Sequence, residues 1–371
     1  MQTTAVQTTY RAEVLGSLLR PRYLTQARAD LEAGRIGAPE FKRIEDRAVD
    51  QAIALQEGAG LDVVSDGEFR RLSFLDHWLA VLEGVKPSPG LKVAFHGGPI
   101  EDDFQFSSPV AAVERVQRRR MLTIEEFTYA RSKARRPLKM TLPSPLLLYT
   151  LWSPQQSRDA YPDIFDLFEH GVELLRDEIR ELAALGCTYI QIDAPDLGTI
   201  VDPEHRALRE AHGMSTDRTL TEGIDLMNAV ADVPGVTFGL HLCKGNYLSK
   251  WISAGGYESI AEAVFKRATN YDVFLLEYDD ERSGSFEPLA QVPDDKVVVL
   301  GLISSKTTDL EPVEQVVARI NEAARFFPRE QLALSTQCGF ASVSVGANLI
   351  TEDTQEAKLH LVADIAHEVW G

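Results

Sequence analysis

Four side chains in the C-terminal part of the chain have the chemistry of a metal site. His241 and Cys243 are two positions apart in the apolar run Thr237–Cys243, so on an extended strand their side chains point to the same face. Cys338 ends another apolar run and Glu277 lies near the end of a third. Each residue alone is explained more simply as part of a core. Together, one imidazole, two thiolates and one carboxylate predict a tetrahedral Zn²⁺ site.

Other polar residues follow neighbouring apolar runs. The run Asp62–Glu68 ends in Ser65, Asp66, Gly67 and Glu68, and Tyr189–Pro195 carries Asp193 and is followed by Asp196. If all these runs are parallel strands, their carboxyl ends meet at one rim. Cys187 differs from the other two cysteines because it follows Gly186 in a predicted helix-to-strand turn. We therefore interpret Cys187 as a buried structural cysteine.

The elements that must position these residues alternate along the chain. Short apolar runs are each followed by a loop and a helical pattern, and most runs are continuously apolar, as in parallel strands buried on both faces. We predict six main helices, over Pro39–Gly58, Ile164–Leu185, Leu220–Val233, Tyr257–Ala268, Glu311–Phe327 and Thr351–Val369. The eight runs are Glu13–Ser17, Asp62–Glu68, Leu138–Pro143, Tyr189–Pro195, Thr237–Cys243, Val273–Asp279, Val297–Ser304 and Leu332–Cys338. This order predicts an α/β fold, a single (β/α)8 barrel with its active site at the strands' carboxyl ends.

One long segment interrupts this order. Residues Asp76–Arg136 lie between the second and third predicted strands, and we interpret them as a hairpin plus a helix over Thr123–Arg135 at the barrel rim. The basic run Arg118–Arg120 within it is most simply a solvated face. We expect residues 1–371 to form one domain with 76–136 as its insertion.

Composition excludes several classes of protein. The 371 residues include 38 Lys and Arg against 56 Asp and Glu, a net charge of −18, which disfavours nucleic-acid and anionic-membrane partners. Three cysteines are too few for a disulfide framework and suit a reducing compartment. Met1–Glu13 has no apolar stretch typical of a secretory signal, and no apolar run approaches the length of a membrane span. We expect a cytoplasmic protein, and self-association into a homo-oligomer is left open.

The sequence resembles the catalytic domain of cobalamin-independent methionine synthase and its short single-barrel relatives, in the same superfamily as the epoxyalkane–coenzyme M transferases. The matching segments occur in the family's order across nearly the whole chain. They are Val14–Pro21, Ser65–Arg71, Ile190–Pro195, His241–Cys243, Glu277 on its apolar strand, Gly301–Lys306 and Gln337–Gly339.

The resemblance implies roles for individual residues. By that resemblance, His241, Cys243, Glu277 and Cys338 hold a catalytic zinc ion, and Ser17, Glu68 and Asp193 bind the amino-acid part of homocysteine. A buried ammonium group needs carboxylate partners, which agrees with this assignment. We expect Glu277, the hardest of the four ligands, to loosen as the substrate sulfur enters. Glu277 and Asp193 are accordingly the expected catalytic residues.

Two departures from the family pattern concern the methyl donor. The usual Asp-Glu-Pro after the fourth strand is Asp193-Ala194-Pro195 here, and the seventh strand ends in Ser304-Ser305-Lys306, where the full-length enzyme has a histidine assigned to proton transfer. The chain also has no room for that enzyme's N-terminal barrel, so we expect poor use of long polyglutamyl folates. A folate, a corrinoid or another methylated compound is left open as the donor.

Three functions are compatible with these observations. The first is zinc-dependent methyl transfer to homocysteine, giving methionine. The second is addition of another zinc-bound thiolate to a different electrophile, as in epoxyalkane–coenzyme M transferases. A sulfonate-bearing thiol needs cations, and six stand near strand ends: Arg20, Arg22, Arg70, Arg71, Lys244 and Lys306. The third is a non-catalytic barrel that binds a metal or a partner.

Overall fold

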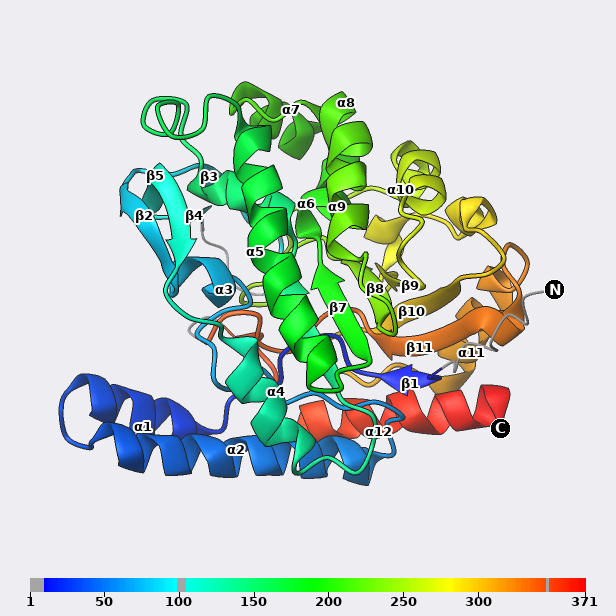
Figure 1. The fold of residues 1–371 in the computed structure, drawn as a ribbon. Helices are drawn as coiled ribbons and strands as arrows, with labels where there is room; N and C mark the ends of the chain where they lie inside the picture. Colours follow the sequence, from blue (N-terminus) through cyan, green and yellow to red (C-terminus); the bar gives the residue numbers. More distant parts are fainter. Residues whose placement is uncertain (1–9, 99–104, 345–346) are drawn as a thin grey trace.

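A curled parallel sheet forms the centre of the molecule (Figure 1). The structure, a computed structural model, describes residues 10–98, 105–344 and 347–371. Within them, seven strands are hydrogen-bonded in the order β1-β11-β10-β9-β8-β7-β6. Their bounds are β1 Ala12–Glu13, β6 Lys139–Pro143, β7 Tyr189–Asp193, β8 Thr237–Leu242, β9 Val273–Glu277, β10 Val297–Ile303 and β11 Leu332–Thr336. All seven lie within or close to predicted runs, which confirms the α/β barrel class.

The second predicted strand, Asp62–Glu68, differs from the expectation. Val64 forms an isolated parallel bridge with Leu138, next to β6. On the other side, the Asp62 N–H donates to the Ala12 carbonyl in β1 at 2.9 Å. The segment therefore fills the gap between the first and last strands of the sheet, but as a bridge rather than a strand.

Side-chain hydrogen bonds explain why no longer ladder forms there. The amide of Gln56 takes the place of a neighbouring strand, accepting from the Ser65 N–H at 2.9 Å and donating to the Ser65 carbonyl at 2.8 Å. Gly67 and Glu68 then adopt φ values of 72° and 58°. Left-handed backbone conformations end an extended segment, and they are rare outside glycine.

Helices surround the barrel, and each predicted helix forms with shifted ends. Residues Leu220–Val233 divide into a π-helical turn, Thr219–Gly223, and α9; Tyr257–Ala268 divides into a 3-10 turn and α10. Helices α1 and α7 and the short helices α3, α6 and α8 are not among those predicted. The bounds are α1 Arg22–Glu32, α2 Ala38–Ala59, α3 Asp76–Leu79, α4 Thr123–Arg131, α5 Ile164–Ala184, α6 Pro195–Gly198, α7 Pro203–Ala211, α8 Thr216–Arg218, α9 Ile224–Val230, α10 Ala261–Arg267, α11 Val313–Ala323 and α12 Glu352–Trp370.

Helix α5 shows how the sequence sets these ends. Asp163 caps the first turn, where its carboxylate accepts from the Phe165 N–H at 2.8 Å. Such a cap satisfies one of the free N–H groups at a helix start. At the other end Gly186 has φ 92°, the left-handed position at which helices commonly stop.

The segment between the second and third predicted strands holds two antiparallel pairs and a helix. Strand β2 (Leu82–Pro87) pairs with β5 (Val110–Arg118), and β3 (Lys92–Ala94) pairs with β4 (Gln105–Ser107). Helix α4 packs against α2 and α5. Figure 1 shows the strand pairs beside the upper part of α5 and α4 near its lower end. The two strand pairs thus lie at the carboxyl end of the barrel, toward which β7 points. Helix α4 belongs to the outer ring of helices.

The barrel is filled on both sides of its strands. One layer inside the sheet consists of Leu15, Val273, Leu275, Val297, Val299 and Ala333. The alternating residues, such as Phe274 and Leu276, belong to the larger core beneath the helices. Inside the barrel, the Lys139 ammonium pairs with the Glu13 carboxylate, and both are almost fully buried.

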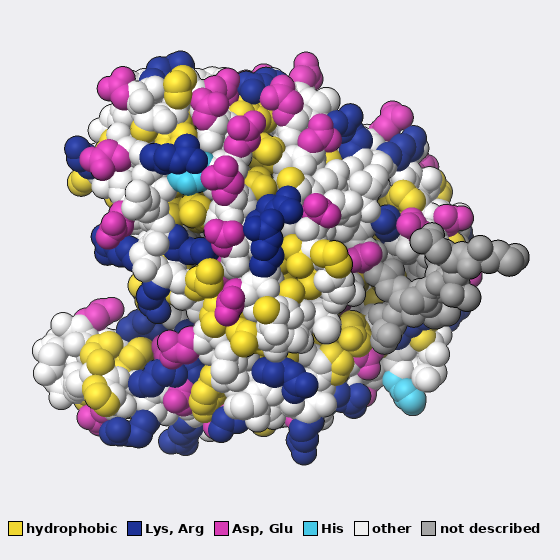
Figure 2. Space-filling model, viewed as in Figure 1, with side chains coloured by type: hydrophobic (Ala, Val, Ile, Leu, Met, Phe, Trp, Pro, Cys, Tyr) yellow, Lys and Arg dark blue, Asp and Glu magenta, His cyan; other side chains and the backbone are white. Residues whose placement is uncertain are grey.

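The face covered by α2 and α5 carries acidic and basic side chains interspersed (Figure 2). The left edge of this view is hollowed between the α1–α2 hairpin and the part of the chain around α3 and β3. In the described part of the chain, no helix has the length and apolar character needed to cross a bilayer.

Candidate active site

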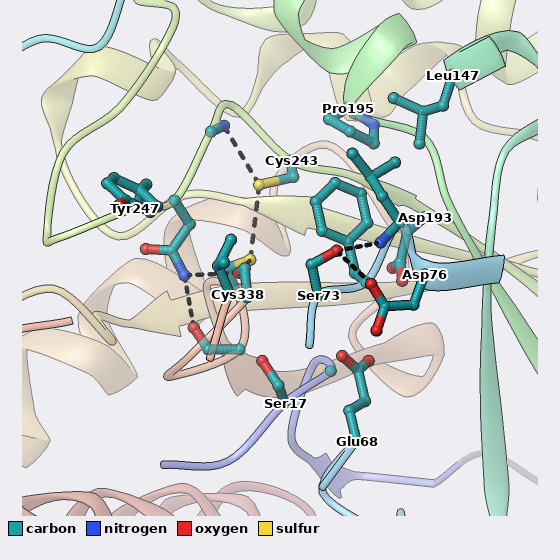
Figure 3. A pocket seen from close by; sticks show the side chains of 18 of the residues that line it. Ser17, Glu68, Ser73, Asp76, Leu147, Asp193, Pro195, Cys243, Tyr247 and Cys338 are labelled. Carbon is teal, nitrogen blue, oxygen red and sulfur yellow. Dashed lines mark hydrogen bonds between the residues drawn. The ribbon is translucent and has the colours of Figure 1, made fainter. Parts of the chain in front are cut away.

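A cavity of about 580 Å³ lies at the carboxyl ends of the strands. Its polar wall comes from residues at or just beyond the ends of the sheet strands, Ser17, Asp193, His241, Cys243 and Cys338, together with Glu68 of the bridge segment (Figure 3). Its apolar wall includes residues of the insertion and of the 3-10 helix Pro145–Leu151: Leu79, Ala80, Val93, Phe95, Leu147 and Tyr149. One cavity therefore joins a group of metal-binding side chains to an apolar chamber.

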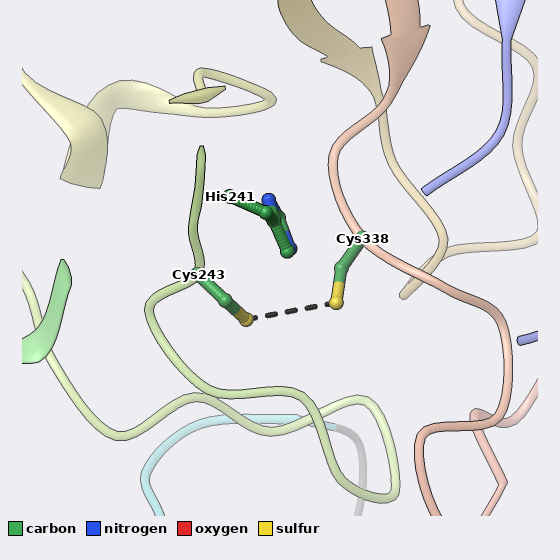
Figure 4. A group of neighbouring side chains, drawn as sticks. All are labelled: His241, Cys243 and Cys338. Atoms are coloured by element: carbon green, nitrogen blue, oxygen red, sulfur yellow. Dashed lines mark hydrogen bonds between the residues drawn. The ribbon is translucent and has the colours of Figure 1, made fainter. Parts of the chain in front are cut away.

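Three of the four predicted zinc ligands meet at the base of this cavity. The ligand atoms of His241, Cys243 and Cys338 lie within 4.8 Å of one another (Figure 4). The two sulfur atoms are 3.6 Å apart. That distance is far longer than a disulfide, and close to the roughly 3.8 Å expected of two thiolates on one tetrahedral Zn²⁺ with Zn–S bonds of about 2.3 Å.

The hydrogen bonding of His241 leaves one ring nitrogen, Nε2, available to bind a metal. Nδ1 lies 3.3 Å from the carbonyl of Leu275, to which it donates. Nε2 is buried and has no hydrogen-bond partner. A backbone acceptor on one nitrogen fixes the tautomer and directs the lone pair of the other, which is the usual arrangement of a metal-binding histidine. The orphaned nitrogen and the two sulfurs therefore fit a zinc ion.

The two thiols differ in pKa. The hydrogen bond from Cys243 and then the nearby His241 imidazole lower the pKa of Cys338 well below its ordinary value, although burial opposes this. The same contact with Cys338, together with burial, raises the pKa of Cys243. The first proton is thus lost easily from the pair. A metal ion supplies the positive charge that stabilises the second thiolate.

The structure does not bring Glu277 into this group. Its side chain is fully buried, but it neither belongs to the metal-binding group nor lines the cavity. Oε1 lies 3.1 Å from the Lys306 Nζ and 3.3 Å from an Arg282 nitrogen, and Oε2 accepts from the Lys244 N–H at 3.0 Å. Burial opposes ionisation, but these cations lower the pKa of Glu277.

The predicted amino-acid site is assembled around two unpartnered oxygens. Ser17 Oγ and Glu68 Oε2 are buried, lack hydrogen-bond partners, and line the same cavity as Asp193. Glu68 Oε1 accepts from the Thr141 hydroxyl at 2.7 Å. Burial raises the pKa of Asp193 to about 6, and the nearby Glu68 adds to this while His241 opposes it. The unpartnered oxygens and the acidic side chains can therefore bind a polar ligand that carries a positive charge.

Close backbone packing sets the position of Ser17. A Cβ added to Gly339 would lie 2.6 Å from the Ser17 N and 2.8 Å from its Oγ. Contacts this short are not tolerated, so only glycine at position 339 allows the loop after β11 to lie against the loop after β1. The neighbouring Cys338 is thereby held beside the amino-acid site.

Comparisons with known proteins agree with this site. A sequence model of the family described as Cobalamin-independent synthase, Catalytic domain, matches residues 11–366. The chain belongs to this family. It is 36% identical over 374 residues to Uncharacterized protein YxjG of Bacillus subtilis, covering 97% of this chain and 95% of that protein. It is 25% identical over 329 residues to the methionine synthase of Pyrococcus abyssi, covering 88% and 85%.

A solved structure shares the fold. The B12-independent methionine synthase of a Shewanella species, in complex with selenomethionine, superimposes with a TM-score of 0.76 at 21% identity, over 98% of both chains. The barrel fold predicted from the sequence is therefore shared with that solved structure.

Several residues that support the site were not predicted from the sequence. Thr141 holds Glu68, and Asn246 donates to the Gly339 carbonyl at 2.6 Å. Lys306 was noted from the sequence, but its pairing with Glu277 was not predicted. Thr141 had a usable signal, since it is polar within the apolar run Leu138–Pro143.

Five of the six cations considered for a sulfonate-bearing thiol are engaged elsewhere, and the sixth, Arg22, is exposed. Arg70 pairs with Glu45 and Asp46, and Arg71 pairs with Glu126. Arg20 donates to backbone carbonyls, Lys244 to the Gly255 carbonyl, and none of the six candidates lines the cavity. The cavity therefore offers a sulfonate no partner among those six.

The basic run Arg118–Arg120 also lies away from the cavity. Arg118 pairs with Glu178 of α5 at 3.0 Å, and Arg119 pairs with Glu83 of β2 at 2.8 Å. None of the three arginines lines the cavity.

Proposed function

We propose that this enzyme transfers a methyl group to the sulfur of homocysteine, giving methionine, with a zinc ion held by His241, Cys243 and Cys338. The observation that carries the proposal is the junction of two sites in one cavity. A nitrogen and two sulfurs suited to zinc lie beside two carboxylates and a free hydroxyl suited to an amino acid. Relatives of this chain are named methionine synthases, which supports the same reaction.

The chain's own residues would bind and orient the substrate. Glu68 Oε2 and Asp193 accept from the ammonium group of homocysteine, and Ser17 Oγ donates to its carboxylate. Glu68 is rigid because Oε1 is already held by Thr141. These contacts are charge-assisted and desolvated, which makes them the stronger kind of hydrogen bond. They direct the thiol of homocysteine toward Cys243 and Cys338.

A zinc ion at these ligands would lower the pKa of the substrate thiol and keep its sulfur nucleophilic at neutral pH. The Leu275 carbonyl keeps His241 in the tautomer that presents Nε2. The apolar wall excludes water from the sulfur. Glu277 is proposed as the fourth ligand of the substrate-free enzyme, which requires its carboxylate to leave Lys306 and Arg282.

Metal analysis combined with a methyl-transfer assay tests the proposal. We expect one zinc ion per chain and formation of methionine from homocysteine when a competent donor is present. Removal of zinc by a chelator abolishes turnover, and its return restores it. Full activity of the zinc-free protein would contradict the proposal.

A further inference from the structure

The cavity has two sides that differ in hydrogen-bonding capacity. Among the described lining residues, the fully buried side-chain atoms without a hydrogen-bond partner are Ser17 Oγ, Glu68 Oε2 and His241 Nε2. All three lie on the side that takes homocysteine and zinc. The opposite side, toward the insertion, offers no such atom in the described residues. Apart from a few hydroxyl groups, such as those of Ser73 and Tyr149, that side is lined mainly by apolar and aromatic side chains, so a ligand there is held chiefly by shape, apolar contact and charge.

Internal contacts engage two of the polar side chains on that second side, Asp76 and Asn246. Asp76 accepts from the Leu72 N–H and from the Ser73 hydroxyl, the latter at 3.1 Å (Figure 3). Asn246 donates to the Gly339 carbonyl at 2.6 Å and accepts from Asn348 at 2.8 Å. These contacts fix both side chains in position at the cavity wall.

The charge of the lining is entirely acidic. In the described residues the cavity is lined by Glu32, Glu68, Asp76 and Asp193, and by no lysine or arginine. Asp76 is 9% exposed and stands on the insertion side. Each of its oxygens accepts one hydrogen bond, and its negative charge acts on the apolar chamber, where a low dielectric strengthens it. An anionic group would be repelled here and a cation attracted.

Aromatic rings complete this chamber. Phe74, Phe95, Tyr149 and Tyr247 line it. The rings of Phe95 and Tyr247 have centroids 5.8 Å apart and are tilted by 60°. Aromatic faces attract cations that cannot donate hydrogen bonds, and desolvation strengthens the attraction.

From these observations we infer that the methyl donor is an onium compound, a sulfonium or quaternary ammonium ion, bound on the insertion side of the cavity. The inference rests on the proposed methyl transfer to homocysteine and adds the class of donor. The thiolate sulfur supplies the electron pair of the new S–CH₃ bond. The bond from that methyl to the onium atom breaks, and its electron pair stays on the leaving sulfide or amine, which departs neutral. The step needs no proton, oxidant or reductant.

Matched probes test the charge preference without turnover. Choline and its uncharged isostere 3,3-dimethylbutan-1-ol are titrated separately into the zinc-loaded protein saturated with homocysteine. We expect choline to bind about fivefold more tightly or better, the effect of one partly desolvated cation–π or charge contact. Equal affinity, or tighter binding of the alcohol, would overturn the inference.

Variants locate the preference. Asp76→Asn is expected to reduce the choline preference to about twofold or less, as one nearby charge is lost. Asp177→Asn, on the exposed surface of α5, is the matched control and should keep it. A preference unchanged in a folded Asp76→Asn protein would contradict the assignment. If that variant does not fold, the two probes on the wild-type protein still decide.

Turnover separates this inference from the proposed function. Trimethylsulfonium should yield methionine and dimethyl sulfide in equal amounts, and tetramethylammonium tests the ammonium arm. Methionine formed from 5-methyltetrahydrofolate or methylcobalamin, but from neither onium probe, overturns the donor class and leaves the proposed function standing. No methionine from any donor, with no binding of homocysteine, overturns the proposed function itself.

Discussion

Thr141 Oγ1 donates a 2.7 Å hydrogen bond to Glu68 Oε1, and this contact turns the second carboxylate oxygen of Glu68 toward the cavity. Thr141 is itself held by Arg71, whose NH1 lies 3.0 Å from its hydroxyl and from its carbonyl. Arg71 in turn pairs with Glu126 at 2.7 Å. All four residues are buried. A fixed chain of charged and polar groups thus orients one predicted substrate-binding oxygen.

Replacing Thr141 by valine should weaken homocysteine binding. The change removes the hydroxyl and keeps the shape, so Glu68 loses one donor and its orientation. We expect a loss of about 1–2 kcal/mol, the size of a hydrogen bond to a charged group. Calorimetry with homocysteine measures the change, and zinc content should not move. Thr141→Ser is the matched control and should bind normally; equal weakening in both variants would contradict the positioning role.

Glu68→Gln tests the ammonium contact directly. The amide keeps the size of the side chain but removes the charge that faces the substrate. A loss of about 2–5 kcal/mol in homocysteine affinity is expected for a desolvated charge pair. Zinc content and the unfolding temperature serve as controls. Unchanged affinity would place the amino-acid site elsewhere in the cavity.

The three cysteines provide a matched test of the metal site. Cys243→Ser and Cys338→Ser should each lose most of their zinc at limiting free metal, because each thiolate is both a charge and a soft donor. Cys187 is equally buried but lies outside the group, so Cys187→Ser should retain zinc. Metal content by mass spectrometry measures all three. Full retention in either of the first two variants would disprove the ligand assignment.

A pH dependence of stability is expected from His205, which lies in α7 away from the metal group. Burial lowers its pKa to about 3. Between pH 3 and its ordinary value near 6.5, the unfolded chain binds a proton that the folded chain does not. Stability from this residue is therefore complete above pH 6.5 and is lost as the pH falls, by about 2 kcal/mol between pH 7 and 5.

The variant His205→Gln removes this titration. Its free energy of unfolding should fall less steeply on acidification than that of the wild-type protein, in urea titrations at pH 7, 6 and 5. Parallel curves for the two proteins would show that His205 titrates normally in the fold.

The sequence allowed the barrel to be predicted because its strands are buried on both faces. Continuous apolar runs such as Val297–Ser304 leave few alternatives. The predicted strand Asp62–Glu68 was the exception. Its ladder is replaced by the side chain of Gln56, which lies in the preceding helix. A side-chain amide that takes the place of a strand leaves no periodic pattern, so this substitution was not predictable.

The candidate site could also be predicted only in part. His241, Cys243 and Cys338 were found because each residue type has its own metal chemistry, and the strand ends bring them together. Glu277 was predicted on the same grounds, but its contacts with Lys306 and Arg282 depend on loop positions that no spacing encodes. The acidic and aromatic lining of the cavity on the insertion side is likewise a property of the assembled fold.

X-ray absorption at the zinc edge, recorded with and without homocysteine, tests the central claim most directly. The account predicts two sulfur ligands in the substrate-free protein, from Cys243 and Cys338, and three once homocysteine is added. The third sulfur should be absent with homoserine, which carries a hydroxyl in place of the thiol. A protein that binds no zinc at this group, or a sulfur count that homocysteine leaves unchanged, would contradict the account.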